Sequence, residues 1–135
     1  MTDRLARSGK VAQEAVTAYR RLAVAELTLP SMRHATSRYS LVEALPLTGR
    51  KHQIRRHFKH LRHPIIGDTT HGDGSHNRCF REEFDCSRLL LHALDLTIPH
   101  PVTGEKLTVT APVDVAFSRL LHRMGWGNIF TEGTR

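Results

Sequence analysis

Hydrophobic and polar residues alternate in part over two stretches near the start of the chain, residues 16–28 (VTAYRRLAVAELT) and 38–45 (RYSLVEAL). Both stretches are rich in β-branched and aromatic residues, and a period of two is typical of strands that bury one face. The segment between them, LPSMRHAT, has the composition of a turn. The pattern therefore predicts two strands joined as a hairpin, with Tyr19 and Tyr39 packed in the core or on a face of the sheet.

A helical pattern follows over residues 49–61. Thr48 offers a hydroxyl that can cap a helix N-terminus, and the next proline along the chain is Pro64. At about 100° per residue, the apolar residues of this segment fall within one narrow stripe. They are Ile54, Phe58 and Leu61. We therefore expect a helix that begins after Thr48 and docks by this stripe.

The other side of this predicted helix is strongly basic. Like charges four residues apart on a helix repel by roughly a few tenths of a kcal/mol per pair. A neutral face would avoid this repulsion, so we expect an anionic partner that offsets it. A solvated charged face is the alternative, which the scarcity of acidic residues between 48 and 64 makes the weaker interpretation. The residues that we expect to bind RNA are Lys51, His52, Arg56, Lys59 and Arg62. We interpret the histidines of this window as further groups that face a polyanion.

The second half of the chain predicts a loop, another hairpin and a closing helix. Residues 65–80 (IIGDTTHGDGSHNRCF) are rich in Gly, Asp, Asn and Ser, which predicts a long irregular loop. Residues 89–98 and 107–111 have strand composition and flank a turn-like segment. Apolar residues at helical spacing over 113–124 predict a short helix. The fold class expected is therefore α+β, mostly antiparallel sheet with a basic helix and a short C-terminal helix.

Length and composition indicate one small domain over residues 1–135, with flexible ends over 1–14 and 129–135. The balance of 20 Lys+Arg against 13 Asp+Glu gives a net charge of +7, which attracts polyanions such as nucleic acid. A basic but otherwise ordinary enzyme is the alternative. Two cysteines are too few for a disulfide framework, and the first ten residues lack the apolar core of a signal peptide. No apolar run is long enough to cross a bilayer, so we expect a cytoplasmic protein without a membrane role.

The sequence gives little support for a metal site or for a catalytic nucleophile. The residue types that suit zinc are present in His71, His76, Cys79 and Cys86. The two cysteines are seven residues apart rather than in the short pairing of structural zinc sites, so we expect no metal. The sequence lacks the phosphate-cradling GxxxxGK and the GxSxG elbow. Three isolated histidines are interpreted as structural or exposed, namely His34, His92 and His122.

Three motifs occur in order along the chain: TGRKHQIRRH, then HPIIGD with HGDGSHNRCF after it, then LLLHALDLTIPHPVTGE. In this order and spacing, they resemble the C-terminal half of the catalytic domain of a pseudouridine synthase, from the large group that modifies ribosomal and transfer RNA. The resemblance is greatest to the transfer RNA pseudouridine synthase C branch. It covers residues 15–128.

This resemblance implies an enzyme that isomerises a uridine inside RNA without cofactor or metal. The glycosidic bond breaks, the base turns, and a carbon replaces the nitrogen on the ribose. An aspartate is the essential catalyst, and the target nucleotide is flipped out of its stack into the site. The implied partner is tRNA, with a target on the T-arm side at uridine 65.

The resemblance also assigns roles to residues of the first two motifs. Arg55 corresponds to the active-site arginine that pairs with the catalytic aspartate, and Ile54 to the apolar residue beside the target base. An arginine fork suits a carboxylate through two hydrogen bonds; a phosphate contact or a surface charge is the alternative for Arg55. Supporting roles in the turn, the helix start and the architecture fall to Gly49, Arg50, His52, Gln53, His63, Pro64, Gly67 and Asp68.

The sequence departs from this family in one respect. The catalytic aspartate belongs to an upstream motif of the form RLDRxTSG, and the chain contains nothing like it, nor the upstream motif of the tyrosine that stacks on the base. The aspartates that the chain does contain lie in sequence contexts unlike that motif. We therefore expect a fragment that is inactive alone, that pairs with a missing N-terminal half, and that self-associates through the exposed interface. The alternative is a stand-alone RNA-binding or vestigial module.

Overall fold

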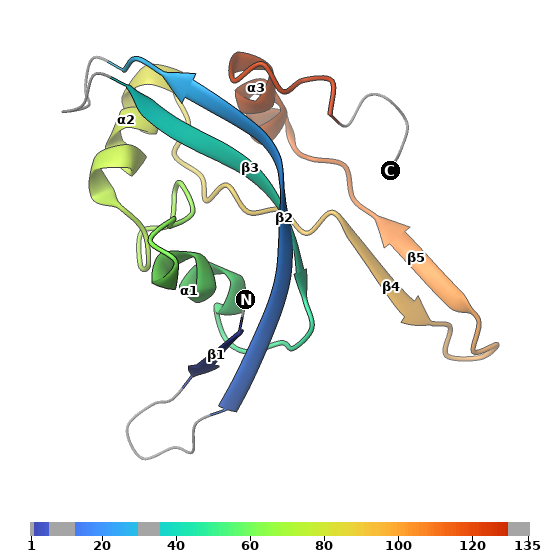
Figure 1. Ribbon diagram of the computed structural model, residues 1–135. Coiled ribbons are helices and arrows are strands. Elements are labelled where there is room, and N and C mark those ends of the chain that lie inside the picture. The colour runs from blue at the N-terminus through green and yellow to red at the C-terminus, as the bar shows by residue number, and fades with distance from the viewer. Residues whose placement is uncertain (1, 6–12, 30–35, 130–135) are drawn as a thin grey trace. The chain divides into compact units, whose positions relative to one another are not determined.

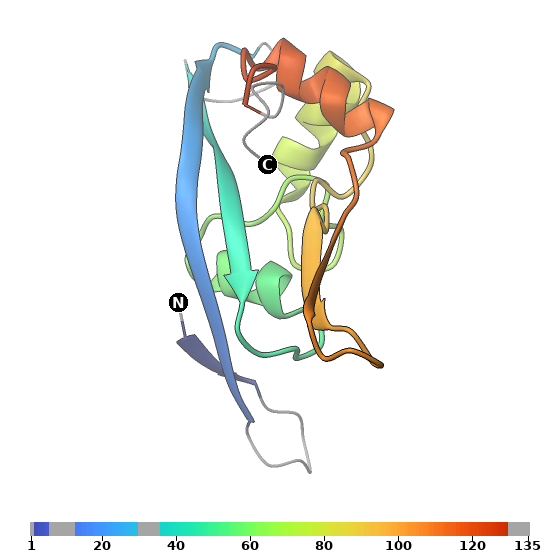
Figure 2. The ribbon, with the colours of Figure 1, turned by 90° about the vertical axis from the view of Figure 1, so that its right-hand side faces the viewer.

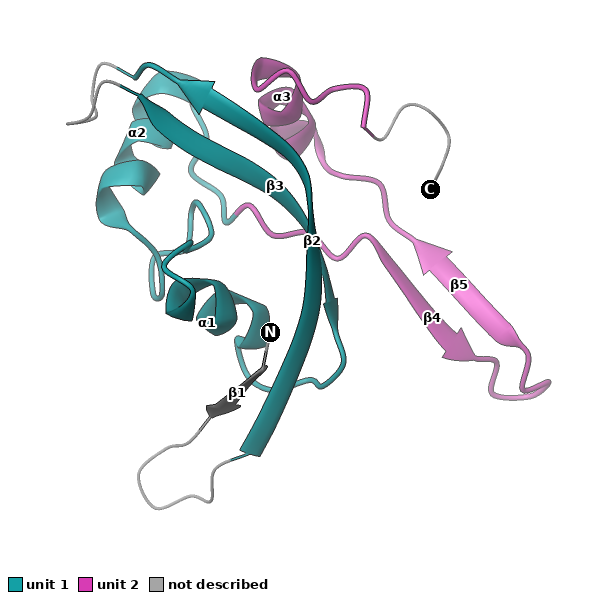
Figure 3. Cartoon of the chain, in the orientation of Figure 1, with its two compact units in different colours: residues 1–89 teal, residues 90–135 magenta. Residues whose placement is uncertain are grey.

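The computed structural model describes residues 2–5, 13–29 and 36–129. Two compact units make up the chain, residues 1–89 and 90–135 (Figure 3). Most of the expected turn between the first two strands, with His34, lies outside the described residues, as does much of the two ends that were expected to be flexible. No helix in the described part of the chain is long and apolar enough to span a membrane.

The first unit is built on an antiparallel sheet of strand order β1-β2-β3 (Figure 1). Its strands are β1 (Thr2–Leu5), β2 (Gln13–Leu27) and β3 (Ser37–Pro46). The long β2–β3 ladder confirms the predicted hairpin, and its register shifts between Arg21 and Ala23, where β2 carries a bulge. Tyr39 packs in the interior as predicted, whereas Tyr19 keeps about half of its surface exposed, at 49%.

Helix α1 (Gln53–His60) begins four residues later than predicted. Its N-cap residue is His52, which adopts a left-handed conformation (φ 52°) and makes no side-chain cap bond. The prediction that Thr48 caps the helix is wrong because its hydroxyl is bonded elsewhere: it accepts from the Val16 N–H (2.9 Å) and donates to Gln53 Oε1 (2.6 Å). Residues 49–52 consequently lie between the sheet and the helix, and a turn at Lys51 and His52 leads into α1.

The buried face of α1 differs from the predicted apolar stripe. Gln53, His57 and Phe58 are buried, and the Phe58 ring meets the ring of Tyr19 edge-on at 5.5 Å. Ile54 is half-buried, whereas Leu61 lies beyond the helix end and is 37% exposed. Two of the three residues that dock the helix are therefore polar.

Helix α2 (Gly74–Phe84) replaces the second part of the predicted loop. The Asp73 carboxylate caps it by accepting from the N–H groups of Ser75 and His76, which satisfies two donors of the first turn. The Phe80 ring then packs edge-on against Tyr39 at 4.9 Å. The prediction of an irregular segment is wrong here because the cap and these apolar contacts outweigh the turn-rich composition.

The second unit contains a hairpin and a helix (Figure 2). Its elements are β4 (Asp95–Pro99), β5 (Lys106–Thr110) and α3 (Val115–Arg123). The antiparallel pairing of β4 with β5 and the presence of α3 confirm the predictions for this part. Residues 89–94, which were predicted as strand, have no regular structure. Asp114 caps α3 by accepting from the Phe117 N–H (2.8 Å).

Candidate functional site

Gln53 joins the start of α1 to strand β2. Its side-chain oxygen accepts from the Thr48 hydroxyl (2.6 Å) and from the Arg50 N–H (3.0 Å). Its amide nitrogen donates to the Val16 carbonyl (2.8 Å) and to the Thr17 hydroxyl (2.9 Å). With only 4% of its surface exposed, this amide has both ends satisfied by the protein. The segment of residues 48–52 is thereby held against the sheet.

His57 extends this buried polar cluster one helical turn along α1. Its Nδ1 lies 2.7 Å from the Thr17 hydroxyl, and none of its surface is exposed. The interpretation that the histidines of this segment face a polyanion is therefore wrong for His57, although His52, His60 and His63 are exposed. Position 57 follows Gln53 by four residues, so both lie on the helix face that meets the sheet.

Arg55 forms a two-bond ion pair with Asp68. Arg55 Nε lies 2.9 Å from Oδ2 and Nη2 lies 2.8 Å from Oδ1. The Asp68 side chain has no exposed surface, and that of Arg55 is 19% exposed. Asp68 Oδ1 also accepts from the backbone N–H groups of Thr70 and His71. Arg55 foremost, then these backbone donors, hold the pKa of Asp68 far below its usual range despite burial, so the carboxylate is ionised.

The backbone around Asp68 is fixed by close packing. Asn77 accepts from the Gly67 N–H (2.8 Å) and donates to the Asp68 carbonyl (2.9 Å), which ties this segment to α2. Gly67 has φ +87°, and a Cβ there would lie 2.0 Å from the carbonyl oxygen of Arg88. Only glycine fits this position. The HPIIGD segment thus presents the Asp68 carboxylate to Arg55 in one fixed orientation.

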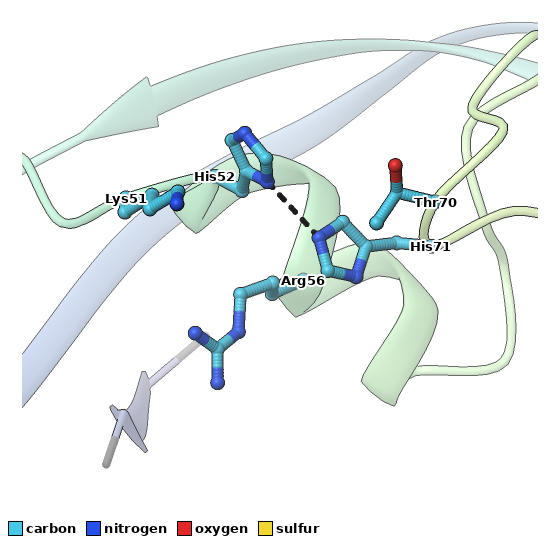
Figure 4. Close-up of a pocket in the computed structure, with 5 residues that line it drawn as sticks. All are labelled: Lys51, His52, Arg56, Thr70 and His71. Carbon is cyan, nitrogen blue, oxygen red and sulfur yellow. Dashed lines mark hydrogen bonds between the residues drawn. The ribbon is translucent and has the colours of Figure 1, made fainter. Parts of the chain in front are cut away.

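A basic pocket opens between the start of α1 and the segment after Asp68 (Figure 4). It has a volume of about 210 Å³ and is lined by Lys51, His52, Arg56, Thr70 and His71. His52 Nδ1 lies 3.1 Å from His71 Nε2. Loss of solvent contact foremost, then the charge of Arg55, lowers the pKa of His52. We call this set of five residues the His52–His71 pocket.

Residues 2–60 match the family described as RNA pseudouridylate synthase. The chain is 54% identical over 126 residues to tRNA pseudouridine synthase C of Vibrio cholerae, covering 93% of this chain and 52% of that protein. It is 48% identical to the Salmonella typhi protein of the same name over 100% of this chain and 52% of the relative. For the Haemophilus influenzae protein of that name, the identity is 43% over 96% of this chain and 54% of the relative.

The chain belongs to the RNA pseudouridylate synthase family. It spans about half the length of the curated relatives that it matches. The α+β architecture of the described residues, with small antiparallel sheets and three helices, agrees with the fold expected for part of such a synthase.

The structure brings together some of the residues expected to bind RNA and not others. Lys51, His52 and Arg56 share the His52–His71 pocket. Lys59 and Arg62 are exposed further along, toward and beyond the end of α1. The sequence patterns did not identify Thr70 and His71 as members of this cluster. Thr70 and His71 follow HPIIGD by two and three residues, and the Asp68 carboxylate of that motif bonds Arg55. This closeness in sequence is the one signal that could have identified them.

The candidate zinc ligands are not gathered into one site. His71 contacts His52, whereas His76 Nδ1 lies 2.7 Å from the Tyr39 hydroxyl. Burial raises the pKa of that Tyr39 hydroxyl to about 12, so it is protonated. The side chains of Cys79 and Cys86 are buried. Within the described ranges, no three His, Cys, Asp or Glu side chains are grouped so that they could hold a metal ion.

Proposed function

We propose that this chain is part of a tRNA pseudouridine synthase, in which it supplies the active-site arginine and part of the surface that binds tRNA. The observation that carries this proposal is the 54% identity to tRNA pseudouridine synthase C of Vibrio cholerae over 93% of the chain. The reaction is an isomerisation of uridine within tRNA. It transfers no electrons and adds no atoms, so we propose no cofactor.

Arg55 is the residue that we propose for the active site. Its pair with Asp68 uses the Nε–H and one Nη2–H. A guanidinium has five N–H donors, so three remain outside this pair, and two of these lie on the edge formed by Nη1 and Nη2. That edge suits a second carboxylate in a two-bond arrangement. We infer that Asp68 orients Arg55 and that the outer edge receives the catalytic aspartate of the remaining half of the synthase.

Asp68 does not fit the role of the catalytic aspartate. Its side chain has no exposed surface, and both of its oxygens are already engaged by Arg55. A nucleotide base therefore has no access to it. This geometry supports the proposal that the catalytic carboxylate comes from outside the chain, in the upstream motif that the sequence lacks. We propose the half-buried Ile54 as the apolar contact beside the target base. We propose a uridine on the T-arm side, at position 65 of the tRNA, as the target.

The test is a chimera in which this chain replaces the matching segment of the Vibrio cholerae synthase, assayed for pseudouridine in unmodified tRNA. We expect activity from the chimera and none from the 135-residue chain alone. Arg55→Lys keeps the charge but loses the planar fork, so we expect kcat to fall by roughly 100-fold or more. Arg38→Lys is the matched control, because the Arg38 side chain is 71% exposed.

Two results would contradict this proposal. Full conversion of tRNA by the chain alone would show that no other half is needed. An R55K chimera as active as the R38K chimera would remove Arg55 from the active site. The position of the product, mapped along the tRNA, separately tests the T-arm uridine.

The net charge of +7 and the basic pocket also favour a second candidate, a module that binds RNA without catalysis. The two candidates differ in one outcome. An inactive chimera, together with salt-sensitive tRNA binding by the chain alone, would favour the binding module.

A further inference from the structure

We propose that the His52–His71 pocket binds one phosphate group of the RNA backbone and that its two histidines make this binding stronger in mild acid. The inference rests on the proposed binding of RNA, but not on catalysis by the chain. The proposal is a single local anion site, which is more specific than the general positive charge of α1.

The chemistry of the pocket lining favours an anion. Lys51 and Arg56 carry positive charge, and Thr70 adds a hydroxyl. The nearest carboxylate, Asp68, does not line the pocket, because it is fully buried and held by Arg55 and two backbone donors. Positive charge is thus concentrated at the pocket, where an RNA phosphate can be bound.

The size of the pocket favours one small group. Pockets for drug-sized ligands occupy roughly 300–1,000 Å³. The volume here is about 210 Å³. A phosphate needs little space and several donors. Each lining residue carries a side-chain N–H or O–H group, from Lys51 and His52 on one side to Thr70 and His71 on the other (Figure 4).

The contact between the two histidines provides the response to pH. The two nitrogens are 3.1 Å apart, and a hydrogen bond between them requires one ring to accept through a lone pair, so this contact forms only while at least one ring is neutral. When both rings are protonated, both of these nitrogens become donors and this contact is lost. A phosphate between them would accept from both rings and replace the lost contact.

A metal ion is the alternative occupant of two facing imidazoles. Two ring nitrogens 3.1 Å apart could approach one cation. Lys51, Arg55 and Arg56 would repel that cation at short range. The described residues also provide no third His, Cys, Asp or Glu ligand at this position. The positive charge around the pocket therefore favours an anion over a metal ion.

The sign of the pH effect follows from linkage. In the free protein, loss of solvent contact foremost, then electrostatic interaction with Arg55, His71 and Lys51, lowers the pKa of His52, and Asp68 opposes this effect only in part. A bound phosphate raises this pKa again. RNA affinity therefore rises as the pH falls through the pKa of the bound state, and it levels off below the pKa of the free state. A rise of one pKa unit on binding corresponds to about tenfold tighter binding.

The experiment measures binding of a fluorescently labelled uridine-rich RNA oligonucleotide to the 135-residue chain, between pH 8 and pH 5.5 at constant ionic strength. We expect the wild-type affinity to rise about tenfold toward pH 5.5. His52→Asn keeps a residue type that tolerates φ 52° but cannot be protonated, and we expect it to lose most of this rise. His71→Gln removes the other ring and is the second variant. His60→Gln is the matched control, because His60 is an exposed histidine of α1 outside the pocket.

A parallel titration with inorganic phosphate, followed by NMR of the histidine ring protons, separates the two possible sources of the phosphate. Shifts of His52 and His71 with both ligands support the proposal. Shifts with inorganic phosphate but no pH-dependent RNA binding would overturn it in favour of a free-phosphate site. If H52N and H71Q keep the wild-type pH profile while general RNA binding persists, the pocket is not the site, and the proposed synthase function stands untouched.

Discussion

Asp68 illustrates how a single residue links the architecture of the chain to its chemistry. Its carboxylate is fully buried, and it is satisfied by Arg55 and by the backbone donors of Thr70 and His71. An ionised carboxylate without solvent is stable only because these donors surround it. The sequence indicated an architectural role for this motif but gave no sign of its partner, because Arg55 and Asp68 are thirteen positions apart and no regular pattern continues from one to the other to fix their distance.

Asp68→Asn should destabilise the chain at neutral pH, since it leaves Arg55 without its charged partner. Removing one member of a largely buried pair costs roughly 3 kcal/mol. The pKa of Asp68 is lowered in the folded state, so its contribution is complete above the unfolded pKa, near 3.8, and is lost as the pH falls below that value. Urea unfolding at pH 7 and pH 3 measures both effects, and the D68N deficit should shrink at pH 3.

Asp73→Asn is the control for this experiment. It makes the same chemical change at an N-cap, where asparagine and aspartate are about equally good. Equal losses in the D68N and D73N proteins would contradict the special role of the buried carboxylate.

At the scale of elements, alternation and composition identified both hairpins and the closing helix. The ladder from Thr17↔Pro46 to Leu27↔Ser37 follows the predicted strands closely, because these residues combine strand propensity with partial alternation of apolar and polar positions. The start of α1 was misplaced because Thr48 has a hydrogen-bond partner in β2, more than thirty residues away in sequence. No local pattern reports such a contact. Helix α2 was missed because its cap, Asp73, lies among glycines that are typical of loops.

The same long-range bonding makes Gln53 a critical residue for the α1–β2 junction. Gln53→Ala would leave the Val16 carbonyl and the hydroxyls of Thr48 and Thr17 to find other partners in a buried place. We expect a loss of about 2–3 kcal/mol in the free energy of unfolding, measured by urea denaturation. Gln13→Ala, at an exposed position of β2, should change it by less than about 0.5 kcal/mol. Similar values for the two variants would show that the buried amide adds no stability.

At the scale of the whole molecule, the chain spans about half of its relatives and carries an exposed apolar surface. Alternation places four apolar side chains on one face of the β4–β5 hairpin, namely Leu96, Ile98, Leu107 and Val109. All four are exposed, from 39% for Ile98 to 63% for Leu96. The opposite face is polar and includes the hydroxyl pair of Thr97 and Thr108 (2.8 Å). Such a ribbon buries little surface by itself and favours association with another apolar surface.

We therefore expect the purified chain to self-associate through this face unless the remaining half of a synthase covers it. Leu96→Thr with Val109→Thr keeps strand propensity at a directly opposed pair while removing apolar surface. Sedimentation at increasing concentration should show the wild-type chain moving toward larger species and the double variant remaining monomeric. Thr97→Ser with Thr108→Ser alters the polar face and keeps its hydroxyl pair, so it should associate like the wild type. A wild-type chain that stays monomeric at every concentration would mean that this face needs no partner, and the apolar alternation of β4 and β5 would then require another explanation.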